Sequence, residues 1–247
     1  MTINILTLKV GDKYSSDYVN KLYNGIKRNT SVDFKFYCYT EDKDELNENI
    51  IVVPLEDPYQ FYKQWHKMTF HKSNFGGIPN GEKCLILDID WIITNNLDDI
   101  FYWDFNEDIA VFERWWSTNR TQCKLNGGFQ MFYMGQTNYV WEKFISDPLM
   151  YQEYYYKSGL CAYPFFGEQN FIDETVISKS WLPMDSFGKY TSEYINFINQ
   201  QWWKEVSMYD SYFIDNEFAE SVKMVHFADR DNMIHEYKDE WIKKYWI

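Results

Sequence analysis

Apolar residues in the first 90 positions form short runs of strand length, separated by longer segments with helical spacing. The strand-like runs lie at residues 3–10, 34–39, 50–53 and 84–87. Residues 18–29 and 61–75 have the spacing of amphipathic helices. The resulting order, strand–helix–strand–strand–helix–strand, is typical of a mostly parallel sheet covered by helices. The pattern therefore predicts an α/β fold.

The remainder of the chain mixes the two periodicities without a break. The pattern predicts strands at 109–112, 128–133 and 222–227, and helices at 139–145, 169–178 and 191–221. No internal repeat, low-complexity tract or flexible linker separates these elements. We therefore expect one domain over residues 1–247.

The strand predicted at 84–87 ends in two carboxylates, Asp88 and Asp90, with Ile89 between them. Residues two apart on an extended chain share a face, so the two carboxylates point the same way. Like charges that close repel unless a cation or a proton lies between them, and a divalent ion with oxygen ligands fits. An acidic strand end that merely reaches the surface explains this short motif equally well on local grounds.

Other polar side chains follow the carboxyl ends of the predicted parallel strands, where ligands of open α/β sheets bind. The first strand contributes Thr7 and Lys9 and is followed by Tyr14, and the second ends in Tyr39, Thr40 and Asp42. A hydroxyl, an aromatic face and a carboxylate converging on one edge suit a nucleoside. Each residue alone is better explained by ordinary turn polarity, and only the group indicates a site.

His226 closes the predicted strand 222–227. A lone histidine after an apolar run is more often structural than a ligand. A metal ion with two aspartate ligands would nevertheless accept an imidazole, if the two strand ends meet in space.

The amino-acid composition limits the classes of partner that the protein could bind. The 247 residues carry 37 acidic and 24 basic side chains, a net charge of −13, which argues against binding nucleic acid or an anionic membrane. Aromatic residues make up 21% of the chain, and their flat faces suit sugars and bases as well as a core. No apolar run approaches the roughly 20 residues of a membrane span. The chain start resembles a first strand rather than a signal peptide, and the four cysteines are widely spaced, so a cytoplasmic location fits.

Taken in order, these segments resemble a nucleotide-sugar glycosyltransferase of the GT-A (Rossmann-like) fold. The resemblance is to the glycogenin and lipooligosaccharide galactosyltransferase type, and most to small virus-encoded members. The most specific match is the Asp-x-Asp block with its continuation to Phe101. The other matching segments are 6–14, 36–42, 65–67, 126–131, 167–169 and 225–227. The resemblance implies a single domain with a mixed, mostly parallel central sheet flanked by helices. It also implies a nucleotide-binding half at 1–100 and a donor-sugar and acceptor half, with C-terminal helices, at 101–247.

The resemblance also implies roles for individual residues. Asp88, Asp90 and His226 would hold Mn²⁺ or Mg²⁺ on the donor pyrophosphate, and Glu168 and Gln169 would lie at the anomeric carbon, where the family has Asp-Gln. Tyr14 and the loop 40–42 would contact the base, expected to be uracil. With the strand-end residues above, the predicted nucleotide and donor site comprises Thr7, Lys9, Tyr14, Tyr39, Thr40, Asp42, Lys67, Asp88, Ile89, Asn126, Gly127, Gly128 and Arg230.

The chain departs from the family pattern in two places. Glu168 replaces the usual aspartate, which keeps the charge and moves it by about one methylene. After the ligand histidine the family has Gly and then Lys-Pro, whereas residues 227–233 here contain neither. Arg230 is the candidate replacement cation, although Asp229 and Asp231 flank it.

The expected activity is metal-dependent transfer of a sugar from a UDP-sugar to a hydroxyl of a carbohydrate or glycan acceptor, with retention of configuration. An inactive homologue and a noncatalytic sugar-binding protein remain alternatives. Candidates for an acceptor platform are Trp115, Trp116, Tyr154, Tyr155, Tyr156, Trp202 and Trp203. A phosphatase of the haloacid dehalogenase type is disfavoured, since Ile92 stands where that class has Thr or Val. Glycoside hydrolysis is rejected, because its two carboxylates must lie about 5–10 Å apart across the bond.

Overall fold

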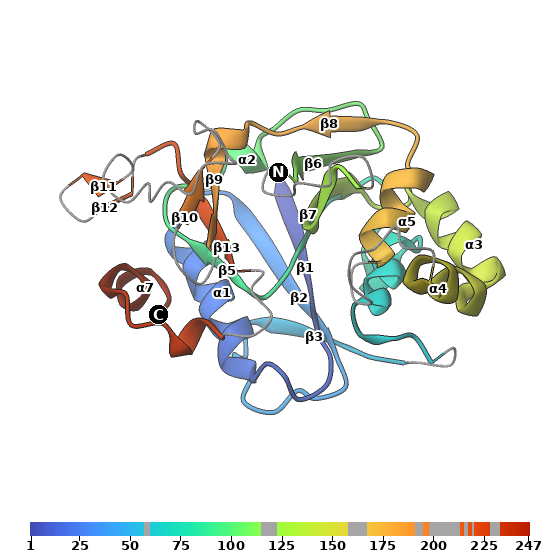
Figure 1. Ribbon diagram of the computed structural model, residues 1–247, viewed down its shortest axis with the longest axis horizontal. Helices are drawn as coiled ribbons and strands as arrows, with labels where there is room; N and C mark the ends of the chain where they lie inside the picture. The colour runs from blue at the N-terminus through green and yellow to red at the C-terminus, as the bar shows by residue number, and fades with distance from the viewer. Residues whose placement is uncertain are drawn as a thin grey trace.

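A computed structural model describes most of the chain and confirms the α/β prediction. The described residues are 1–56, 60–114, 123–157, 167–190, 195–197, 213–214, 217–218, 220–227 and 233–247. The central sheet has seven strands in the order β3-β2-β1-β4-β7-β6-β8 (Figure 1). Their bounds are β1 Thr2–Lys9, β2 Asp33–Thr40, β3 Ile50–Pro54, β4 Lys83–Leu87, β6 Ile109–Glu113, β7 Leu125–Tyr133 and β8 Lys179–Trp181.

The sheet is mixed and mostly parallel. Strands β3, β2, β1 and β4 run parallel, β7 runs antiparallel to β4 and to β6, and β8 is parallel to β6. Strands of both predicted halves thus share one sheet, although the assignment of a single domain stays a prediction. Five consecutive buried residues form β4, as expected for a strand covered on both faces.

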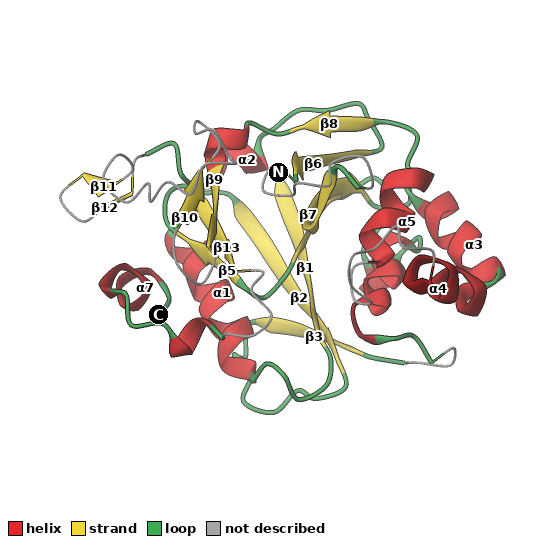
Figure 2. Cartoon of the chain, in the orientation of Figure 1, coloured by secondary structure: helices red, strands yellow, loops and turns green. Residues whose placement is uncertain are grey.

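Helices cover the two faces of this sheet, and alternate residues of the strands belong to two hydrophobic cores. In β4, Leu85 and Leu87 belong to the core shared with helix α1 (Ser16–Arg28), whereas Cys84 and Ile86 belong to the core shared with helices α3 (Asn138–Ser146) and α5 (Gly167–Thr175). The helices are α1 Ser16–Arg28, α2 Asp98–Phe101, α3 Asn138–Ser146, α4 Pro148–Lys157, α5 Gly167–Thr175 and α7 Glu240–Tyr245 (Figure 2).

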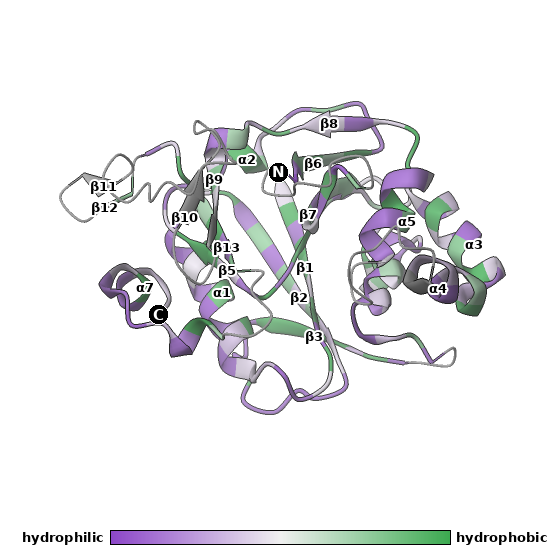
Figure 3. Ribbon diagram, in the orientation of Figure 1, coloured by the Kyte–Doolittle hydropathy of each residue, from purple (hydrophilic) through white to green (hydrophobic). Residues whose placement is uncertain are grey.

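The amphipathic spacing predicted for residues 18–29 is realised in α1. It buries Tyr18, Val19, Leu22 and Ile26 against the sheet, and Figure 3 shows hydrophobic and hydrophilic colours mixed along the helix. The second predicted helix, 61–75, is instead a 3₁₀ helix, η1 (Lys63–His71), followed by a shorter one at Phe75–Gly77. Helices α3, α4 and α5 gather with η1 on the side of β7 (Figure 1).

A second sheet of four short strands was not predicted as such. Its order is β10-β9-β13-β5, with bounds β10 Ile195–Phe197, β9 Phe187–Tyr190, β13 Met224–Phe227 and β5 Trp91–Ile93. Strand β13 confirms the predicted late strand, and its antiparallel partner β5 begins directly after Asp90. This pairing brings residues 224–227, late in the chain, close to the carboxyl end of β4.

The long helix predicted at 191–221 is wrong wherever the structure describes that stretch. Strand β10 lies inside it, and so do the paired strands β11 (Phe213–Ile214) and β12 (Glu217–Phe218). A segment as short as the three residues of β10 fits either structure, and here its pairing with β9 makes it a strand. The remainder of the stretch, apart from residues 220–221, lies outside the described residues.

Candidate functional site

The carboxylates predicted as a pair meet the predicted histidine. Asp88 and Asp90 lie in the link between β4 and β5, and His226 lies on β13. One ligand atom of each residue lies within 4.8 Å of those of the other two. The imidazole Nε2 of His226 is 3.4 Å from Asp90 Oδ1. Thus three residues from two distant parts of the chain form one cluster of donors.

Backbone hydrogen bonds fix this cluster at the end of the central sheet. The amide of Asp88 donates to the carbonyl of Gly128 over 3.0 Å, and the amide of Phe227 donates to the carbonyl of Asp90 over 2.8 Å. The Thr7 hydroxyl donates to the carbonyl of Leu87 over 2.8 Å. The chain on either side of the acidic pair is therefore tied to β1, β7 and β13.

The donor set fits a divalent ion. Two carboxylates and one imidazole are ligands that Mn²⁺ accepts. Burial raises the pKa of Asp88, and the charge of Asp90 raises it further, whereas Lys67 lowers it. Glycine is needed beside the cluster, because a Cβ on Gly128 would lie 2.9 Å from Asp88 Oδ2 and 3.1 Å from His226 Cε1. Because Gly128 has no side chain, the space between Asp88 and His226 stays open.

Gly128→Ala is therefore expected to lower the affinity for Mn²⁺ about 10-fold or more, because the new methyl group pushes ligands apart. Gly127→Ala is the matched comparison, since its Cβ would meet Gln169 Cβ at 2.7 Å rather than the ligands. Mn²⁺ titrations of both variants, with thermal unfolding as the check on folding, measure the difference. Equal metal affinity in the two variants would contradict the role given to Gly128.

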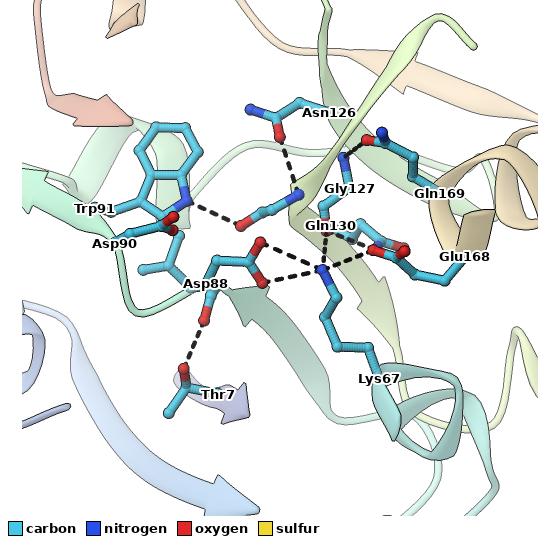
Figure 4. A network of polar contacts seen from close by, with 12 residues as sticks. Thr7, Lys67, Asp88, Asp90, Trp91, Asn126, Gly127, Gln130, Glu168 and Gln169 are labelled. Carbon is cyan, nitrogen blue, oxygen red and sulfur yellow. Dashed lines mark hydrogen bonds and ion pairs between the residues drawn. The ribbon is translucent and has the colours of Figure 1, made fainter. Parts of the chain in front are cut away.

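Lys67, predicted near the donor, stands at the centre of a buried ion-pair network (Figure 4). Its Nζ lies 3.1 Å from Asp88 Oδ1 and 3.0 Å from Glu168 Oε1. It also donates to the carbonyl of Gly127 over 3.4 Å. Burial lowers the pKa of Lys67, but the two carboxylates outweigh it and the net pKa is raised. Burial raises the pKa of Glu168, because one shared cation compensates only part of its lost solvation.

The network is layered. The side chains of Asp88 and Asp90 keep 29% and 15% of their surface exposed. Those of Lys67 and Glu168 keep only 5% and 4%. A ligand approaching from solvent therefore meets the aspartates first, with the lysine and the glutamate behind them.

Gln169 joins the same network from α5. Its Oε1 accepts a hydrogen bond from the amide of Gly127 over 3.2 Å. Its Nε2 is buried and has no hydrogen-bond partner among the described residues, and the same holds for Glu168 Oε2. Buried polar atoms without partners are rare, and they concentrate at functional sites. Asn126 completes this side, with its Oδ1 accepting from the amide of Gly128 over 2.9 Å.

The residues predicted for the nucleoside lie at the ends of β1 and β2. Lys9 pairs with Asp42 over 3.3 Å, and the amide of Asp42 donates to the Thr40 hydroxyl over 3.1 Å. Burial raises the pKa of Tyr14, and so do the charges of Asp90 and Asp88. Tyr39 instead packs in the core beside η1, and its hydroxyl donates to the carbonyl of Glu56 over 3.1 Å.

Other predicted positions fall elsewhere. Ile89 is buried in the core between the two aspartates. Arg230 lies outside the described residues, as do the predicted platform residues Trp115, Trp116, Trp202 and Trp203 and the side chain of Tyr156. Tyr154 is half exposed on α4, whereas Tyr155 is buried.

Two residues of the site were missed by sequence reasoning. Trp91 stacks on His226, and Gln130, fully buried in β7, donates to the carbonyl of Gly127 over 3.1 Å. The signals were present, because a tryptophan directly follows the Asp-x-Asp motif and an amide interrupts an apolar strand.

Solved glycosyltransferases share this architecture. The galactosyltransferase LgtC, in complex with donor and acceptor sugar analogs, matches with a TM-score of 0.58 over 92% of this chain and 87% of its own, at 10% identity. The chain has the GT-A fold. An active-site variant of LgtC with glutamate in place of a glutamine matches with a TM-score of 0.61, at 11% identity over 98% of this chain and 93% of its own.

The bifunctional glycosyltransferase WbbM, in its apo form, matches with a TM-score of 0.59 and 11% identity. This match covers 93% of the present chain but only 46% of WbbM. No protein-family model and no curated protein sequence matches the chain significantly. At these identities the likeness confirms the fold alone, and the predicted closeness to virus-encoded members stays a prediction. Within the described ranges, no helix combines the length and the apolar character that crossing a bilayer requires.

Proposed function

We propose that the protein is a metal-dependent glycosyltransferase that moves a sugar from a UDP-sugar to a hydroxyl of a carbohydrate or glycan acceptor. The cluster of Asp88, Asp90 and His226 carries this proposal, because it assembles a divalent-ion donor set at the end of β4 in a GT-A fold. Solved neighbours with this fold are glycosyltransferases, one of them bound to donor and acceptor analogs.

The three ligand residues would hold Mn²⁺ or Mg²⁺. Bound there, the ion would neutralise the charge that develops on the departing diphosphate. Lys67 adds a fixed positive charge behind the aspartates, since two carboxylates hold its ammonium in place. Tyr14, Lys9 and the loop containing Thr40 and Asp42 would receive the nucleoside at the neighbouring strand ends.

The donor sugar would lie against the place where β7 meets the start of α5. Asn126, Gly127 and Gly128 on β7 and Glu168 and Gln169 on α5 come together there, joined by the hydrogen bond from the Gly127 amide to Gln169 Oε1. A carboxylate and an amide at this place would stabilise positive charge developing on the sugar. The reported active-site glutamine of LgtC supports a role for Gln169. We favour retention of configuration, as the family resemblance implies.

Calorimetric titration of UDP into the purified protein, with Mn²⁺ or with chelator, tests the proposal. We expect micromolar binding that requires the metal ion. Asp90→Ala should abolish the metal-dependent part, whereas Asp104→Ala, an exposed carboxylate after α2, should leave it unchanged. Binding that is unaffected by chelator and by Asp90→Ala would exclude the metal site. Metal-dependent binding would be followed by assays of UDP release from UDP-sugars with and without carbohydrate acceptors.

A further inference from the structure

Trp91 contacts His226, one of the candidate metal ligands, from the core side. It is the first residue of β5, it follows Asp90 in the chain, and it is fully buried. In the antiparallel pair of β5 and β13 it lies directly opposite His226. Residues opposite each other on paired strands project from the same face, so the two rings are neighbours by register.

The two rings are stacked face to face. Their centroids are 4.3 Å apart and their planes differ by 5°. Rotation of the imidazole about its bond to Cβ would drive a ring edge into the indole, so this contact fixes the plane of His226. With the plane fixed, the direction of Nε2 toward Asp90 Oδ1, 3.4 Å away, is fixed as well.

The indole is itself held in place. Its Nε1 donates to the carbonyl of Gly128 over 3.0 Å, and the same carbonyl accepts the amide of Asp88 over 3.0 Å (Figure 4). The rings of Phe112, Phe129 and Phe187 surround the indole, with centroids 6.4, 6.4 and 5.8 Å from it. One side chain thereby connects the strand that carries His226, the backbone of Asp88 and the glycine beside both ligands.

We infer that Trp91 is a positioning residue for the divalent-ion site, acting through the ring of His226. This inference rests on the proposed function. An imidazole gains positive character when it coordinates a cation, and an aromatic face favours that charge. A residue that orients a metal ligand commonly changes metal affinity 10- to 100-fold when it is removed. An aliphatic residue here could fill the space but could neither stack nor donate to Gly128.

Trp91→Leu and Trp91→Phe separate these contributions. Mn²⁺ affinity is measured by the paramagnetic resonance of the free ion, with and without UDP, and the Co²⁺ complex gives an absorption spectrum that reports ligand geometry. We expect Trp91→Leu to weaken Mn²⁺ binding at least 10-fold and to shift the Co²⁺ bands. Trp91→Phe keeps a ring face but loses the N–H group, and should weaken binding about 2- to 5-fold with a smaller shift.

Phe112→Leu is the matched control. It removes a ring that packs on Trp91, Phe129 and Phe187 in the same core, so it should lower thermal stability without changing the Co²⁺ spectrum or Mn²⁺ affinity. If Trp91→Leu does not fold, the contrast between Trp91→Phe and Phe112→Leu decides. Spectra and affinities equal to wild type in the Trp91 variants would overturn the inference. A wild-type protein that binds no Mn²⁺, with or without UDP, would overturn the proposed function instead.

Discussion

Lys67→Met is expected to abolish metal-dependent UDP binding and to lower the free energy of unfolding at neutral pH by about 3–5 kcal/mol. The lysine side chain is 5% exposed and lies within 3.1 Å of carboxylate oxygens of both Asp88 and Glu168. Methionine fills similar space but carries no charge. The variant would bury two carboxylates without their cation, which is the costly way to break a buried ion pair.

The loss should depend on pH in a defined direction. Burial already raises the pKa of Asp88 and of Glu168, and removal of the cation that lowers both pKa values raises them further. The folded variant then keeps protons that the unfolded chain releases above its ordinary carboxyl pKa of about 4. Stability of Lys67→Met should therefore fall as pH rises from about 4 toward neutrality. Urea unfolding at pH 4.5 and at pH 7.5, beside calorimetry with UDP and Mn²⁺, measures both effects.

Lys83→Met is the matched control, because Lys83 is also buried but serves a structural contact. Its Nζ donates to the carbonyls of Phe101 and Trp103 over 2.9 and 2.6 Å, and burial lowers its pKa. This variant should lose stability without the added pH dependence and should still bind UDP. If Lys67→Met bound UDP as well as Lys83→Met does, Lys67 would have no part in the nucleotide site.

The sequence was sufficient to predict six of the seven strands of the central sheet, because these strands contain apolar runs bounded by turns. Strand β8 (Lys179–Trp181) was not predicted. Residues of β1 and β4 are buried on both faces, and this leaves a pattern that is independent of the rest of the fold. The candidate ligands were also predictable. The spacing of Asp88 and Asp90 indicated a pair of carboxylates, and the resemblance added His226, although the structure places residues 89 and 90 in a turn rather than on the strand.

Contacts between distant segments could not be predicted. The ion pair of Lys67 with Glu168 joins η1 to α5, and the sequence of neither segment indicates that the other is its partner. The pairing of β13 with β5 was not predicted either, because β5 has only three residues and is specified by its partner strand. The wrong helix at 191–221 has the same cause, since β10 exists through its partner β9.

Glu168→Gln is expected to lower sugar transfer about 100- to 1,000-fold while UDP and Mn²⁺ still bind. The amide keeps the shape of the side chain and an oxygen that can accept from Lys67, now 3.0 Å from Glu168 Oε1. It removes the negative charge that would face positive charge developing on the donor sugar. Turnover of a UDP-sugar and calorimetry with UDP, run on the same preparation, separate transfer from binding.

The same substitution should make the protein more stable at neutral pH. Burial raises the pKa of Glu168 above its ordinary value of 4.5, so the folded state holds a proton more tightly than the unfolded chain does. The free energy of unfolding of the wild type therefore falls as pH rises above the ordinary carboxyl pKa. Glutamine does not titrate, so the variant lacks this contribution. In urea unfolding, the free energy of unfolding of the variant should increase relative to that of the wild type between pH 4.5 and pH 7.5.

Glu174→Gln supplies the control, because it makes the same change on an exposed residue of the same helix. It should alter neither transfer nor the pH dependence of stability. Unchanged turnover in Glu168→Gln would show that the buried charge takes no part in transfer. If Glu168→Gln is slower in sugar transfer and more stable than wild type, this carboxylate lowers stability but is required for activity. Such an opposition between stability and activity is expected of a buried charge with a catalytic function.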